Sequence, residues 1–115
     1  MLNAEEIKMN NVFEELGTVD AQSIGKWGRM HEAYLKEAHS LLYHQLIQNG
    51  TLRKHLSEVD VRASIMLERM ISEMAKQEGI TERLKAEQPM VWVGMMNNIR
   101  NRVEEIVRQE VIDTL

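Results

Sequence analysis

The sequence predicts an all-α fold, a single-domain helical bundle of five or six helices. Three observations support this prediction. The 115 residues include one proline, five aromatic residues of the Phe, Trp and Tyr types, and nine methionines, a composition that favours helices over strands. Apolar residues recur three and four positions apart, and no segment alternates apolar with polar residues over the length of a strand. Residues that commonly begin or end helices separate these periodic segments.

Length and composition limit the class of protein. A domain of this size buries roughly two-thirds of its unfolded surface, so a hydrophobic core is enough to hold it together. The hydrophobic and charged fractions, 43% and 28%, are those of a globular protein. The absence of cysteine excludes disulfides and thiolate sites and suits a reducing compartment. Acids at the N-terminus replace the positive charge of a secretory signal, and no apolar run reaches the roughly 20 residues of a membrane span. We therefore expect a cytoplasmic protein without membrane contact.

Charge is unevenly distributed along the chain. The net charge is −4, and residues 1–24 hold five of the acids but only one base, Lys8, so acids and bases balance in the remainder. Residues 25–115 therefore lack the excess of positive charge that dominates non-specific affinity for DNA. Any nucleic-acid contact is therefore expected to be local, or assisted by a partner.

The N-terminal 23 residues are predicted to form an acidic arm helix and linker, ahead of a helical domain over residues 24–115. Asn3 is placed as the N-cap, with Glu6 three residues later as in a capping box. The arm's apolar residues follow helical spacing and make one face that needs a partner. These residues are Met9, Val12, Phe13 and Leu16.

The middle of the chain is predicted to hold a linker and three or four helical segments. The linker covers residues 18–28, and the next helical stretch breaks near Ser40 and ends at Gly50. Thr51 is expected to cap a short helix over residues 51–60, and Asp60 a longer one over residues 61–78. The buried side of the first stretch is Met30, Tyr34, Ala38, Leu41, Leu42 and Leu46, and that of the long helix is Ala63, Met66, Leu67, Met70 and Met74.

Two further helices complete the predicted fold. Thr81 caps a helix of one or two turns, and Pro89 takes the favoured first position of the last helix. The last helix carries an apolar seam spaced four, three, four, three, which is expected to pack against the helix over residues 61–78. The seam is Trp92, Met96, Ile99, Val103 and Ile106, widened by Val93, Val107 and Val111.

The sequence offers little for catalysis or metal binding. The histidines at 31, 39, 44 and 55 have no i, i+4 partner and no HExxH context, so separate solvated or hydrogen-bonded histidines are expected. Nucleophile motifs and phosphate-binding glycine loops are also missing from the sequence. The stripe of Met66, Met70 and Met74 is interpreted as core rather than as a binding groove. We expect no enzyme, no cofactor and no metal.

Two segments are candidates for binding nucleic acid or a partner. Residues 52–70 fit a helix-turn-helix in which residues 61–70 read the groove, although simple bundle packing is favoured. Its cations are Arg53, Lys54, Arg62 and Arg69. The second candidate is "MMNNIRNR", because Asn and Arg can bond base edges in bidentate fashion.

The alternative for "MMNNIRNR" is structural. In this interpretation Asn97 and Arg100 bond neighbouring helix ends and fix the register of the bundle, which the following acids favour. Only Asn98, Asn101 and Arg102 are then expected to face outward.

The blocks "GKWGRMHEAYLKEA", "LYHQLIQNGTLRKHLSEVD" and "AKQEGITERLKAEQPMVWVGMMNNIRNRVEEIV" together resemble the transposon-encoded TnpV family. The resemblance covers about residues 24–112 and leaves the acidic arm outside. It implies a small accessory protein carried on a mobile element beside a site-specific recombinase, without a family active site. The leading hypothesis is thus a non-enzymatic factor that assists recombination or excision by contacting transposon-end DNA, the recombinase or both. A homodimer is compatible with the sequence.

A protein-binding inhibitor is the alternative. Mobile elements carry small acidic proteins that occupy the nucleic-acid channel of a host nuclease, and the acidic arm suits such a role. Its partner face is Glu5, Glu6, Met9, Phe13, Glu14 and Glu15.

Overall fold

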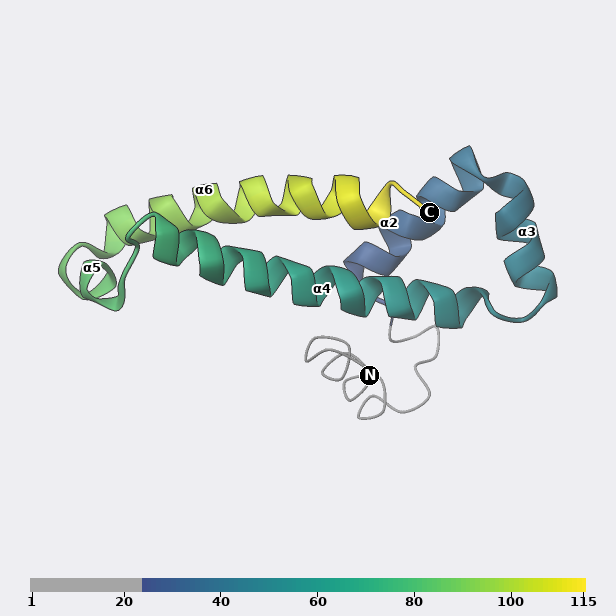
Figure 1. Ribbon diagram of the computed structural model, residues 1–115, viewed down its shortest axis with the longest axis horizontal. Coiled ribbons are helices and arrows are strands. Elements are labelled where there is room, and N and C mark those ends of the chain that lie inside the picture. The colour runs from purple at the N-terminus through teal and green to yellow at the C-terminus, as the bar shows by residue number, and fades with distance from the viewer. Residues whose placement is uncertain (1–23) are drawn as a thin grey trace.

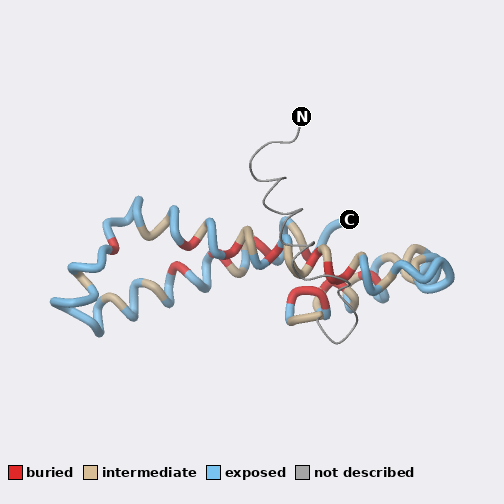
Figure 2. The backbone as a smooth tube through the Cα atoms, turned by 90° about the horizontal axis from the view of Figure 1, so that it is seen from below, coloured by how far each residue is buried: buried red, intermediate tan, exposed pale blue. Residues whose placement is uncertain are grey.

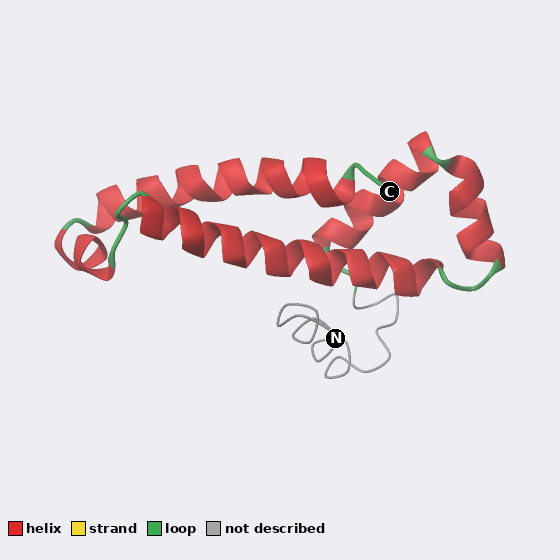
Figure 3. Ribbon diagram, viewed as in Figure 1, coloured by secondary structure: helices red, strands yellow, loops and turns green. Residues whose placement is uncertain are grey.

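The computed structural model describes residues 24–115 and confirms the all-α prediction (Figures 1 and 3). Over these residues the elements are α2 (Lys26–Ala38), α3 (Ser40–Gln48), α4 (Leu52–Gln77), α5 (Glu82–Glu87), α6 (Pro89–Val107) and a π-helical turn, η2 (Arg108–Ile112). The predicted arm helix and its partner face lie outside the described residues.

An antiparallel hairpin of α4 and α6 forms the long axis of the fold, and α2 crosses it near the C-terminus (Figure 1). The predicted packing of the last helix on the long helix is therefore confirmed. Ile99 and Val103 are fully buried on α6, opposite Ala63 and Leu67 on α4 in the same core cluster. Figure 2 shows the buried positions gathered around the α2 crossing, while the α5 end is mostly exposed.

The buried stripes differ in detail from the predicted ones. On α4 the most buried apolar residues include Val59 and Ile71, which the prediction omitted, while the three predicted methionines are only partly buried against the core. On α6, Val107 is fully buried instead of flanking, and Val93 is exposed. At the C-terminal end of α6, Trp27 of α2 and Ile112 of η2 join Val107 in the core cluster, whereas the beginning of α6 lies beside the short helix α5.

The predicted helix boundary at Asp60 is wrong, because α4 continues without interruption from Leu52 to Gln77. Asp60 caps a different helix. Its Oδ1 accepts a hydrogen bond of 2.8 Å from the backbone N–H of Gly28, in the first turn of α2. The first backbone N–H groups of a helix have no acceptor within the helix, and the carboxylate accepts from one of them. Its negative charge also interacts favourably with the positive end of the helix dipole.

The predicted linker is also too long, since α2 already begins at Lys26 and buries both Trp27 and Gly28. Glycine at 28 lets the two helices approach closely. A Cβ there would lie 3.0 Å from the carbonyl oxygen of Leu56 and 2.6 Å from Cγ2 of Ile24. Gly28, which was predicted to lie in a linker, is therefore part of the contact between α2 and α4.

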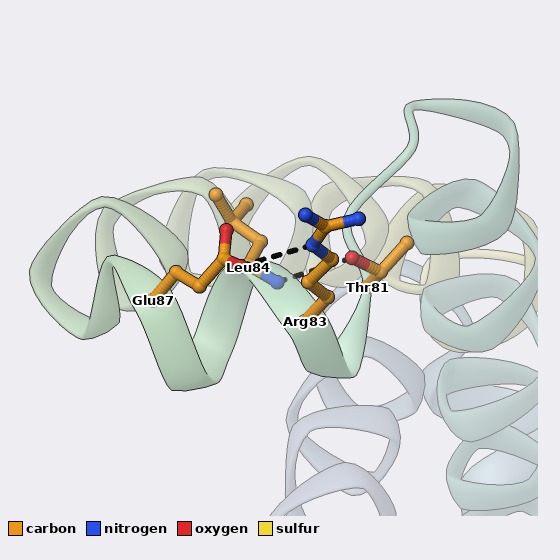
Figure 4. A network of polar contacts seen from close by, with 4 residues as sticks. All are labelled: Thr81, Arg83, Leu84 and Glu87. Atoms are coloured by element: carbon orange, nitrogen blue, oxygen red, sulfur yellow. Dashed lines mark hydrogen bonds and ion pairs between the residues drawn. The ribbon is translucent and has the colours of Figure 1, made fainter.

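The other predicted turns are largely confirmed. Gly50 and Gly79 follow α3 and α4 with φ of 71° and 70°, the left-handed conformation that glycine adopts without steric cost. Thr81 caps α5 by accepting a 3.1 Å hydrogen bond from the N–H of Leu84 (Figure 4). Pro89 opens α6. The break between α2 and α3 falls at His39, which is the N-cap residue in place of Ser40.

The Gly28 and Asp60 contact can be tested by stability. We expect Asp60→Ala to lower the free energy of unfolding by about 1 kcal/mol, the usual cost of losing a helix cap. Gly28→Ala is expected to lower the free energy of unfolding by more than Asp60→Ala. The added methyl group meets the backbone carbonyl oxygen of Leu56, which cannot move without the rest of α4. Urea denaturation followed by circular dichroism measures both changes. Ser72→Ala, at an exposed position of α4, is the control, and equal stability of all three variants would contradict the account.

Candidate functional site

The four predicted cations of α4 are exposed but are not gathered into one surface. Arg53 and Lys54 lie in the first turn of α4, beside α3. Arg62 and Arg69 are seven residues apart, so they share one side of the helix, away from Ala63 and Leu67 in the core.

The surface around Arg62 and Arg69 carries both signs of charge. An open concavity of about 890 Å³ along α4 is lined by these two arginines and Lys76, and also by Glu68 and Glu73. The acids would repel a phosphate backbone that approached the arginines. The continuous helix also removes the turn that the predicted helix-turn-helix over residues 52–70 required, so that hypothesis is wrong.

The three polar residues predicted to face outward on α6 are all exposed, as expected. Arg102 is engaged within the fold: its Nη2 donates to both carboxylate oxygens of Glu78, at 2.8 and 2.9 Å. Glu78 is the C-cap residue of α4, so this pair joins α6 to the end of the facing helix. Arg102 therefore has the register-fixing role that the sequence analysis assigned to Asn97 and Arg100, which are both exposed.

The predicted site residues fall at different ends of the hairpin. Arg53 lies at the start of α4, whereas Glu78, the partner of Arg102, follows the last residue of α4, about 38 Å away along the helix axis at 1.5 Å per residue. A single DNA-reading surface made from all seven predicted residues is therefore not present.

A surface that the sequence analysis missed lies where α3 meets α4, and we call it the α3–α4 corner. Helix α3 contains no buried residue, although it is rich in leucine and isoleucine. Leu41 and Ile47 are 72% and 47% exposed. A groove of about 240 Å³ is lined by Leu46, Ile47, Gly50, Leu52 and Arg53.

The α3–α4 corner combines apolar surface with positive charge. Lys54 is exposed next to Arg53, and the turn between the helices is three residues long and contains Gly50. Two helices joined by such a turn are typical of helix-turn-helix motifs, in which the first turn of the second helix meets the ligand. The turn signal at Gly50 was visible in the sequence, but the unburied state of α3 was not.

A buried histidine pair joins α2, α4 and the C-terminus. His31 is 2% exposed, and its Nδ1 donates to the carbonyl oxygen of Ile112 at 2.7 Å. Its Nε2 then lacks a proton in the neutral ring and accepts from Nε2 of His55, at 3.1 Å. His31 and His55 are therefore hydrogen-bonded, as the prediction allowed, but they are bonded to each other and not separate. Tyr34 and His39 make a second contact of 2.9 Å nearby.

The pair gives stability a pH dependence. Burial, and then the adjacent His31, lower the pKa of His55, with Glu58 opposing and Arg62 adding to the effect. The folded state therefore binds fewer protons than the unfolded chain, whose histidine pKa is about 6.5. It follows that the contribution of His55 to stability is fully present above pH 6.5 and is lost as the pH falls below that value towards the lowered pKa of the folded state.

We expect the melting temperature to fall between pH 7.5 and pH 5.5, and His55→Gln to flatten this dependence, because the amide keeps a donor but does not titrate. Thermal melts at a series of pH values measure the slope. His44→Gln, on exposed α3, is the matched control. A slope that is unchanged in the His55 variant would contradict the assignment.

The Arg102–Glu78 pair is expected to contribute modestly to stability. Both side chains are partly exposed, at 44% and 39%, so solvent screening holds the coupling to roughly 0.5 to 1 kcal/mol even with bidentate geometry. A double-mutant cycle with Arg102→Ala and Glu78→Ala measures it, and added salt should weaken it. The i, i+4 pair of Arg83 and Glu87 provides the comparison. Zero coupling at low salt would remove the register-fixing role.

The described residues contain neither a metal-binding cluster nor a membrane-spanning helix. Within residues 24–115 no group of three or more His, Cys, Asp or Glu side chains is arranged to hold a metal ion. No helix in the same range combines the length and apolar character needed to cross a bilayer.

Comparison with known proteins gives one match. A family model described as "Transposon-encoded protein TnpV" matches residues 7–112. The match begins well before residue 24, so it includes most of the acidic segment that the quoted blocks left outside. No match was found among curated proteins or among solved structures.

Proposed function

Because the chain belongs to the transposon-encoded protein TnpV family, we propose that it is a non-enzymatic accessory factor that assists excision by binding the recombinase on transposon-end DNA. The observation that carries this proposal is the α3–α4 corner. Ile47 is exposed in the groove that Arg53 also lines, Lys54 is exposed next to Arg53, and Leu41 is exposed at the other end of α3.

The chemistry of the corner suits a mixed protein and phosphate surface. Burial of Leu41 and Ile47 against an apolar patch of the partner is favourable in free energy, by about 25 cal/mol per Å² of apolar surface buried. In this proposal Arg53 and Lys54 contact phosphates, and such contacts position a protein on DNA without reading its sequence. The proposed role is therefore attachment to a complex.

Binding to DNA alone is the weaker form of the hypothesis. Acids and bases balance outside the N-terminal segment, and the arginines of α4 share their surface with glutamates. Two phosphate contacts release few counterions, so affinity for free DNA is expected to be low at physiological salt. The recombinase supplies the remaining contacts in this proposal.

The inhibitor alternative depends on the acidic arm, which lies outside the described residues. It stays a prediction from the sequence, with the six-residue partner face given above. Deletion of the gene separates the two roles, since an accessory factor changes excision of its own element and a nuclease inhibitor changes survival of foreign DNA.

An excision assay in cells and a gel shift with transposon ends, with and without recombinase, test the accessory role. We expect Arg53→Ala with Lys54→Ala to reduce excision at least about tenfold, and to lower the slope of log affinity against log salt by about 2. Leu41→Ser with Ile47→Ser is expected to abolish only the recombinase-dependent shift.

The matched control is Lys76→Ala with Arg83→Ala, two exposed cations on α4 and α5 away from the corner. Normal excision after deletion of the gene, together with no shift in either gel, would sink the proposal. Circular dichroism of each variant separates loss of binding from loss of fold.

A further inference from the structure

The outward side of α6 carries a second helical seam, opposite the buried one. Val91, Gly94, Asn98 and Asn101 are spaced three, four and three residues apart, so they lie in one line along the helix. All four are exposed, and Met90 and Met95 flank them at 80% and 37% exposure. We call these six residues the neutral face.

The neutral face is without formal charge. Residues 88–99 contain no ionisable side chain, which is the longest such run in the chain, and Asn101 adds an uncharged amide. The rest of the surface mixes acids and bases on every helix except α3. An uncharged face is poorly suited to a phosphate backbone, which requires cations.

Packing among residues 24–115 does not account for the composition of this face. Within these residues a Cβ at Gly94 would meet no atom within 4 Å, so glycine there costs the helix stability without serving a contact in the part of the chain that the structure describes. Asparagine is likewise a weak helix former. Residues that oppose the local structure, and that have no packing reason within it, fit a contact with something outside.

Helix α5 leaves this side of α6 open. Its Leu84 packs towards the core, and Lys85 lies 4.7 Å from the ring centroid of Trp92, on the buried seam. The exposed side of α5 is charged, with Arg83 bound to Glu87 at 2.9 Å (Figure 4). Among the described residues nothing therefore covers the neutral face, which lies at the end of the hairpin most distant from α3 (Figure 1).

We propose that a second copy of this chain covers the neutral face, with the two α6 helices parallel about a two-fold axis. In this arrangement each residue lies opposite its own copy, so like charges would repel and an uncharged seam is required. An asparagine amide both donates and accepts, and so can bond its own copy, as a single Asn does at an a position of a parallel coiled coil. Gly94 lets the two backbones approach.

The seam ends where charge returns. Glu105 and Arg108 continue the same line but form an ion pair within the helix, at less than 3 Å. A parallel pairing would place Glu105 against its own copy, so the helices must diverge after Asn101. The contact is short compared with standard interfaces, which makes the dimer weak and concentration-dependent. This inference does not depend on the proposed function.

The absence of cysteine allows a direct test on the full chain. We expect Asn98→Cys to form a disulfide-linked dimer under mild oxidation much faster than Ser72→Cys on the exposed side of α4, because a parallel two-fold axis places residue 98 beside its copy. Equal rates for the two variants would overturn the parallel arrangement.

Sedimentation equilibrium over a range of concentrations gives the second readout. The full chain is expected to approach twice its 13.4 kDa mass as concentration rises, and Val91→Lys to stay at one chain mass because two like charges would face each other. Val93→Lys, at 40% exposure on another side of the same helix, is the matched control and should still dimerise. A monomer at all concentrations, or a dimer indifferent to Val91→Lys, would overturn the proposal.

Discussion

The close approach of α2 to α4 is the constraint on which the fold depends. The hydrogen bond from Gly28 to Asp60 fixes the first turn of α2 on the middle of α4, and the missing Cβ at Gly28 makes the short distance feasible. From that point α2 carries Trp27 into the core and His31 to His55 and Ile112. The position of α2 therefore determines where the chain's C-terminus docks.

The same constraint explains why α3 is exposed. Since α2 lies on α4 and ends at Ala38, α3 continues from the far end of α2 and returns to α4 through the turn at Gly50. It packs little against either neighbour, and its Leu41 remains in water. Surface apolar side chains of this kind commonly mark interaction sites. The α3–α4 corner thus follows from the architecture of the domain rather than from a motif within α3.

The sequence predicted the helical class, the α4 and α6 packing, the Thr81 cap and the Pro89 start, because each depends on local chemistry or on a regular apolar period. It misplaced the boundary at Asp60 for a physical reason. An Asp before an apolar run is an N-cap signal, and nothing local shows that the N–H it satisfies belongs to another helix. The seven candidate binding residues do not form one surface for a similar reason, because nothing local shows the tertiary partner of each side chain. Arg102, for example, binds Glu78, which is 24 residues away in the sequence.

The Asn and Arg stretch of α6 now divides by what each side chain meets. Arg102 is bound to Glu78, and Ile99 and Val103 fill the core, which leaves Asn98 and Asn101 in line with Val91 and Gly94. Base recognition by asparagine requires cations nearby to hold the phosphates, whereas Arg102 and Arg108 are bound to Glu78 and Glu105 and the face from Met90 to Asn98 carries no charge. Amides on an uncharged face are instead suited to pairing with their own copies. In the proposed dimer one helix serves two packing surfaces, a buried one within the chain and an exposed one between chains.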